Sequence, residues 1–211
     1  MPPPIRMETV ELMDPGAVQA EWAQVAEARP QMRQLAQASN ARGYVPLETE
    51  DAVLGVRYRA QAGAEITAPR EFGVTASVQQ VEFEIRVRSL VMPGTANQAA
   101  IATATISAGE NSSTYEAFLE ARNGNFNQVT EYTIAGNRLT QAESWWTALV
   151  RCLSGSCATT CLGALVSCTG AWAAYVLCVL AACGGCGAKC AACATCNCSW
   201  WCRWAAGCCE Q

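Results

Sequence analysis

Histidine is absent from this chain of 211 residues, and cysteine is absent from its first 151 residues. The lack of histidine excludes catalytic triads and dyads with a histidine base, and zinc sites built from two cysteines and two histidines. No glycine-rich phosphate loop and no nucleophile elbow occurs either. We therefore expect a protein that is not an enzyme and that needs no cofactor.

Basic residues are also scarce. Lys189 is the only lysine, and the formal net charge is −4. Because the chain has no basic stripe, we expect no nucleic-acid partner. The first residues lack the basic and apolar regions of a secretory signal peptide, so the export route is left open.

All 14 cysteines lie in the segment from Cys152 to Cys209, where the only charged residues are Lys189 and Arg203. A segment of this size rarely folds on hydrophobic burial alone, and disulfides usually stabilise it. The even number permits complete pairing, but the sequence does not reveal which cysteines pair. The predicted disulfide cysteines are Cys152, Cys157, Cys161, Cys168, Cys178, Cys183, Cys186, Cys190, Cys193, Cys196, Cys198, Cys202, Cys208 and Cys209.

A helix is predicted over residues 15–42, directly after Asp14, which is a typical N-cap residue. Apolar residues recur at helical spacing along this range. Pro30 predicts a kink or break within it, because proline removes a backbone donor. Gly43 is a plausible C-cap. We expect this helix to pack on the sheet that follows it.

The apolar period changes to two after residue 44, most clearly over residues 81–88. There apolar residues alternate with Glu82, Glu84, Arg86 and Arg88, which predicts a strand with one buried and one wet face. The neighbouring opposite charges indicate a solvated surface rather than an acid/base pair. Further strands are predicted at 54–58, 99–107, 115–121 and 126–134, the last two joined by a turn at Asn123-Gly124.

Residues 162–182 form a stretch with few polar interruptions and no charge. It is long enough to cross a bilayer, but a helical hairpin bent near Thr169-Gly170 and buried in a disulfide-bonded fold explains it as well. Tryptophans lie on both sides of the stretch, and they either contact a membrane–water interface or cover a small core. These candidate membrane-interface residues are Trp145, Trp146, Trp200, Trp201 and Trp204.

Metal binding is the main alternative to disulfide formation for so many cysteines. The two CxxC pairs, at residues 183–186 and 193–196, are only six residues apart, too close for a zinc ribbon. The run that starts at Cys190 begins like an iron–sulfur motif, but Trp200 holds the position of the fourth ligand. We therefore predict no metal site and keep a cysteine-rich metal-binding module as an alternative.

The tail, with paired tryptophans before the first cysteine and an Ala/Gly/Leu/Val-rich texture around the cysteines, resembles the halocin C8-like bacteriocin family. Members of that family carry a small, apolar, cysteine-rich peptide at the C-terminus of a longer precursor. The resemblance implies that proteolysis releases the peptide, that the peptide kills related cells, and that the N-terminal part binds it and confers immunity.

We predict an α+β fold: a helix with an antiparallel sheet of four to six strands in residues 1–143, then a small disulfide-rich, mainly α-helical module in residues 144–211. The predicted function is a bacteriocin-like precursor, cut by a processing protease within residues 136–151. Its expected partners are the membrane of a competing cell and, within the chain, the N-terminal domain. It is expected to be secreted or cell-surface. The alternative is a membrane-anchored interaction protein with a transmembrane helix near residues 162–182.

Overall fold

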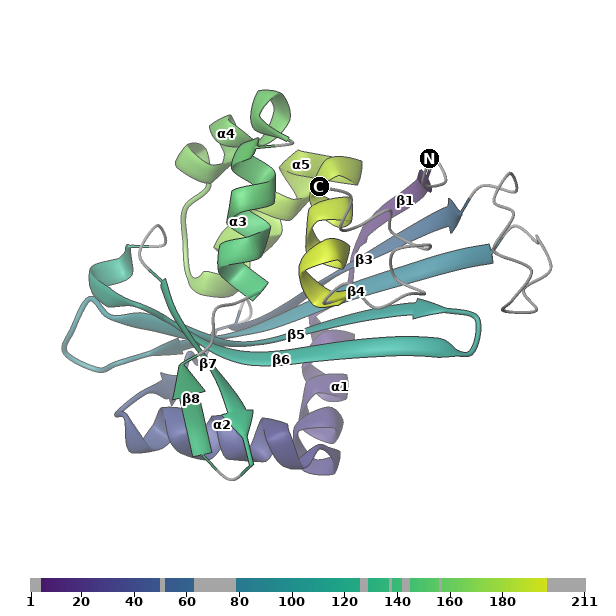
Figure 1. The fold of residues 1–211 in the computed structure, drawn as a ribbon. Helices are drawn as coiled ribbons and strands as arrows, with labels where there is room; N and C mark the ends of the chain where they lie inside the picture. The colour runs from purple at the N-terminus through teal and green to yellow at the C-terminus, as the bar shows by residue number, and fades with distance from the viewer. Residues whose placement is uncertain are drawn as a thin grey trace.

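The computed structural model describes residues 5–49, 52–62, 79–125, 129–136, 138–141, 145–155 and 157–196. Within these ranges, eight strands form one antiparallel sheet with helices on both faces (Figure 1). The predicted α+β class is therefore correct. The strands are β1 (Ile5–Leu12), β2 (Val45–Pro46), β3 (Val53–Ala62), β4 (Gln79–Val91), β5 (Gln98–Ala108), β6 (Asn111–Ala121), β7 (Val129–Ala135) and β8 (Arg138–Gln141). The helices are α1 (Pro15–Ala28), α2 (Pro30–Ala41), α3 (Trp145–Gly155), α4 (Ala158–Ser167) and α5 (Trp172–Cys196), with a short 3-10 turn η3 (Arg122–Gly124).

Helices α1 and α2 replace the single predicted helix over 15–42, and the break falls where proline predicted it. The backbone N–H of Ala17 donates to Oδ2 of Asp14 at 2.8 Å, which caps α1. Arg29 is extended because a residue before proline is disfavoured in the helical region. Gly43, with φ +89°, follows the end of α2 in the left-handed conformation that glycine favours.

The strands of the sheet follow the order β1-β3-β4-β5-β6-β7-β8, and β2 pairs with β4 beside them. The predicted strands over 54–58, 81–88, 99–107 and 115–121 lie within β3, β4, β5 and β6. The turn at Asn123-Gly124 is correct, although β7 begins later than residue 126. The expected count of four to six strands is too low, because the two end strands β1 and β8 and the two-residue β2 were missed. On β1, Val10 and Leu12 are both exposed, so this strand shows no clear alternation of buried and wet faces.

The two faces of the sheet carry separate apolar cores. Helices α1 and α2 cover one face, where Val18, Trp22 and Leu35 are buried with Phe118 of β6. Gly55 of β3 permits the close approach of α1 and of the segment before it, because a Cβ at that position would lie 3.2 Å from Cγ2 of Val18 and 2.8 Å from Sδ of Met13. The charged residues of β4 lie on this same face.

Helices α3 and α5 cover the opposite face, and α4 packs on these two helices (Figure 1). This is the face that the alternation in residues 81–88 predicted to be buried: Val81, Phe83, Ile85 and Val87 all belong to one core with the cysteine-bearing helices. The helix predicted over 15–42 does pack on the sheet, as α1 and α2, which confirms the expectation. This pair lies on the face that carries the charged residues of β4, where Arg86 pairs with Glu21 of α1.

Candidate functional site: the cysteine-rich helices and their seat on the sheet

The apolar stretch at 162–182 is a helical hairpin. Helix α4 ends at Ser167, and α5 begins at Trp172 after a break in which Gly170 has φ +117°. The predicted bend near Thr169-Gly170 is confirmed, and a single helix over 162–182 is wrong, because the chain reverses there. Within the described residues, the helix over Trp172–Thr195 is long and apolar enough to cross a membrane by length and composition, but 56% of its apolar window is buried in this fold. It is also kinked at Gly184, where the backbone is not helical (φ 53°, ψ −133°).

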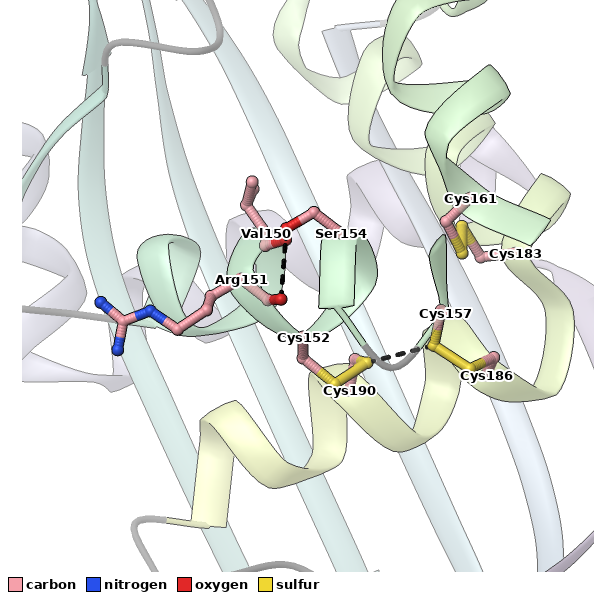
Figure 2. Close-up of a disulfide and its surroundings, with 9 residues drawn as sticks. All are labelled: Val150, Arg151, Cys152, Ser154, Cys157, Cys161, Cys183, Cys186 and Cys190. Carbon is pink, nitrogen blue, oxygen red and sulfur yellow. Dashed lines mark hydrogen bonds between the residues drawn. A yellow bond between two sulfur atoms is a disulfide. The ribbon is translucent and has the colours of Figure 1, made fainter. Parts of the chain in front are cut away.

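Four disulfides join described cysteines, with Cα atoms 5.1 to 5.9 Å apart. Three of them join α3 or the start of α4 to α5 (Figure 2). The segments run antiparallel, so cysteines further along α3 and α4 pair with cysteines nearer the start of α5. The fourth closes the bend between α4 and α5. The pairs are Cys152–Cys190, Cys157–Cys186, Cys161–Cys183 and Cys168–Cys178.

The other predicted disulfide cysteines are placed less completely. Cys193 is also disulfide-bonded, and no described cysteine is free. Cys196 is the last residue of α5. The remaining predicted residues lie outside the part of the chain that the structure describes; they are Cys198, Cys202, Cys208, Cys209, Trp200, Trp201 and Trp204.

Helix α5 lies across β3, β4 and β5, and this contact forms the seat of the cysteine-rich helices on the sheet. Trp172 and Leu180 of α5 are fully buried in the same core as Val56 and Ile85 of the sheet. A fully buried side chain of this size contributes about 1.5–3 kcal/mol relative to exposure to water. Separating the two parts would therefore expose apolar surface on both, at a cost of several such terms.

Polar contacts fix the seat at the start of α3. Glu131 of β7 is 3% exposed, and its two carboxylate oxygens accept the backbone N–H groups of Trp145 (3.1 Å) and Trp146 (2.9 Å). The hydroxyl of Tyr115 donates to the same carboxylate. The first N–H groups of a helix have no partner within the helix, and a negative charge there is favourable. Burial and the nearby carboxylate raise the pKa of Tyr115 well above its usual range, so this hydroxyl stays protonated as a donor.

A second polar contact holds the start of α5. The backbone N–H of Ala173 donates to Oγ of Ser89, which lies on β4, at 2.8 Å. Sequence reasoning missed both Ser89 and Glu131. The signal that could have found Glu131 is a carboxylate on the inward face of a strand, directly opposite the buried Leu119 of β6. Such a group needs donors from another element, because an unpaired buried charge is costly.

Trp145 and Trp146 lie inside the core. They are 2% and 3% exposed, and the ring of Trp146 packs edge to face on Trp172 at 4.9 Å between centroids. The indole N–H of Trp145 donates to Oγ1 of Thr195 at 2.8 Å, which joins the start of α3 to the end of α5. In the intact fold both rings are core residues, and contact with a membrane stays a prediction for a released segment.

The acidic residues of β4 form ion pairs, but only Glu82 is solvated: its side chain is 41% exposed, whereas that of Glu84 is 14% exposed. Glu82 pairs with Arg59, at 3.1 Å, and Glu84 pairs with Arg86, at 2.7 Å, on the face that carries α1 and α2. Each carboxylate faces a guanidinium rather than a second carboxylate. The sequence pattern indicated opposite-charge pairs rather than an acid/base pair, and that is confirmed; the predicted wet face is confirmed for Glu82 but not for Glu84 and Arg86, which are largely covered.

Comparisons with known proteins do not place the chain in a family. No protein-family model matches it, and neither a curated protein nor a solved structure matches it significantly. The resemblance of its tail to the halocin C8-like bacteriocins therefore stays a prediction.

Proposed function

We propose that this chain is a bacteriocin-like precursor whose disulfide-bonded C-terminal segment, residues 144–211, is released by proteolysis and acts on the membranes of competing cells. Residues 1–143 hold the segment inactive in the intact chain. The observation that carries the proposal is the seat of α5: among the described helices, the one that is both long and apolar enough to cross a membrane lies against the apolar face of the sheet, with 56% of its apolar window buried.

Release of the segment requires that nothing but noncovalent contact remains after the cut. Residues 1–151 contain no cysteine, so no disulfide can join the first part of the chain to the second. The four disulfides among described cysteines instead lie within residues 152–190. A cut before α3 would thus leave a segment with its own covalent links and no bond to the sheet.

The exposed hairpin between β7 and β8 is a suitable place for the cut. Gly136 lies in its turn and is exposed, whereas the start of α3 at Trp145 is held by Glu131 and buried. Proteases need an extended, accessible backbone, and exposed loop tips provide it. Within the predicted range of 136–151, we therefore place the cleavage site before Trp145.

Disulfides favour an oxidising environment, which agrees with a secreted or cell-surface protein.

The second candidate function is a membrane-anchored interaction protein, and the length and apolar composition of Trp172–Thr195 favour it. The two candidates differ in what reaches the membrane: a released segment in the first, and the intact 22.4 kDa chain in the second.

Vesicle leakage with a chain that can be cut on demand tests the proposal. A site for a specific protease is inserted after Gly136 in the oxidised full chain, which is added to dye-loaded vesicles before and after cutting. We expect no leakage from the intact chain, and leakage together with growth inhibition of sensitive cells after the cut. The matched control has the same site at the β5–β6 turn, after Gly109; cutting there leaves β6 and β7 attached to the segment, so the pairing of β6 with β5 still holds the segment on the sheet.

The outcome that contradicts the proposal is a cut, separated segment that causes neither leakage nor growth inhibition at micromolar concentration. Membrane fractions that retain the intact chain after carbonate extraction would support the anchored protein instead.

A further inference from the structure

Two of the disulfides lie side by side between the helices. Cys152–Cys190 joins α3 to α5, and Cys157–Cys186 joins the N-cap residue of α4 to α5 one turn away (Figure 2). The Sγ atoms of Cys157 and Cys190, which belong to different disulfides, are 3.4 Å apart. The sulfur atoms of Cys152, Cys157 and Cys190 all lie within 4.8 Å of one another. The fourth sulfur, of Cys186, is bonded to that of Cys157.

The separations between sulfurs of different disulfides, 3.4 Å for Cys157 and Cys190 and at most 4.8 Å within the group of three, are close to those of thiolates around one metal ion. In a tetrahedral zinc site the Zn–S distance is about 2.3 Å, so neighbouring sulfurs lie about 3.8 Å apart. Cys152 lies on α3, Cys157 is the N-cap of α4, and Cys186 and Cys190 are four residues apart on α5 and share a face. Small rotations of the side chains would bring all four sulfurs around an ion without displacement of the helices.

We propose that, when these two disulfides are reduced, Cys152, Cys157, Cys186 and Cys190 bind one zinc ion as a four-thiolate site. Each disulfide takes two electrons and two protons from a dithiol, which is itself oxidised to a disulfide. The zinc ion then displaces the protons of the four thiols. The proposal does not depend on the bacteriocin-like function, since it concerns the reduced chain alone.

The surroundings of the cluster favour thiolates and give access to them. Cys157 lies at the N-terminus of α4, where the partial positive charge of the helix stabilises a thiolate. Cys157 and Cys190 are buried, which shields the centre, whereas Cys152 and Cys186 are half-buried and leave a side for the reductant and the ion. Among the described residues, the other disulfides bring no such group of three sulfurs together.

A metal-bound form would hold the same helices together where disulfides cannot persist. Reduction removes the links of α3 and of the start of α4 to α5, and small domains without disulfides or metal are rarely stable. A four-thiolate zinc site restores both links with one ion. The cysteine-rich helices would then stay seated on the sheet in a reducing environment, before the disulfides form.

Alkylation of the wild-type chain, followed residue by residue, tests the proposal directly. The full chain is reduced with a phosphine under anaerobic, native conditions, given one equivalent of zinc, treated with iodoacetamide for a short time, and mapped by mass spectrometry. We expect zinc to slow alkylation of the four site cysteines at least tenfold, with little change at Cys168. Equal rates with and without zinc at the four cysteines would overturn the proposal.

Paired variants give an independent measurement of the same site. The double variant Cys152→Ser with Cys190→Ser should bind one zinc equivalent fewer than the reduced wild type. The matched control, Cys168→Ser with Cys178→Ser, removes another disulfide of the same helices and should bind as much zinc as the wild type. Equal zinc content in the two double variants would overturn the proposal, and if either variant does not fold, the alkylation pattern of the wild type decides.

Discussion

Replacement of Glu131 by alanine would remove the carboxylate that holds the start of α3 on the sheet. Three donors would lose their acceptor: the backbone N–H groups of Trp145 and Trp146 and the hydroxyl of Tyr115. Each buried donor left without a partner costs about 1–3 kcal/mol, and water entering the cavity would offset part of that cost. We expect a loss of about 3–5 kcal/mol, which is a large share of the 5–15 kcal/mol of a typical domain.

Urea unfolding of the oxidised full chain, followed by tryptophan fluorescence, measures this loss. Glu82→Ala is the matched control, because Glu82 is a glutamate of the same sheet that is about 41% exposed and pairs with Arg59 at the surface. An exposed ion pair contributes less than about 1 kcal/mol, so the control should stay close to the wild type. A loss below 1 kcal/mol for Glu131→Ala would refute the argument that this carboxylate secures the helix. Amide exchange at Trp145 and Trp146 should also be faster in Glu131→Ala only.

Three further changes test other parts of the fold. Asp14→Ala removes the N-cap of α1 and should cost about 1 kcal/mol in urea unfolding; an unchanged midpoint would contradict the capping role. Ile85→Ala leaves a cavity under the cysteine-rich helices and should cost about 2–5 kcal/mol, whereas Val166→Ala, at an exposed position, should change stability by less than about 0.5 kcal/mol. Burial raises the pKa of Glu116 against the opposing charge of Arg29, so the folded state takes up a proton more readily than the unfolded state. Ionisation of Glu116 therefore lowers the free energy of unfolding as the pH rises through the raised pKa. Glu116→Gln removes this loss, so the difference in free energy of unfolding, variant minus wild type, should become more positive from a pH below about 4 to neutral pH. A difference that becomes more negative over that range would contradict the raised pKa.

Local features were predictable where a proline or glycine sets the backbone conformation, or where apolar residues recur with one clear period. Pro30 ends α1 because of its ring, Gly170 permits the bend before α5, and the alternation over 81–88 defines the two faces of β4. The strands β1 and β8 were missed because end strands pair on one side only, so their side chains show no regular burial.

The candidate site could be predicted in part. The cysteines and the hairpin were visible as composition and as a glycine signal. The buried positions of Trp145 and Trp146 were not, because a tryptophan pair beside an apolar stretch fits a membrane interface and a core equally well. Glu131 was hidden for a different reason: its donors lie 14 and 15 residues away in another element.

The sequence by itself determined the helix pair and the central strands, the division of cysteine and charge between the two parts, and the existence of an apolar sheet face. Tertiary structure alone decided what covers that face and which cysteines pair. The hydrophobic effect is non-directional, so an apolar period of two predicts that one face of a strand is buried but does not indicate which element covers that face. Disulfide pairing depends on Cα separations of a few ångströms, and only the packing of α3 and α4 on α5 sets those distances.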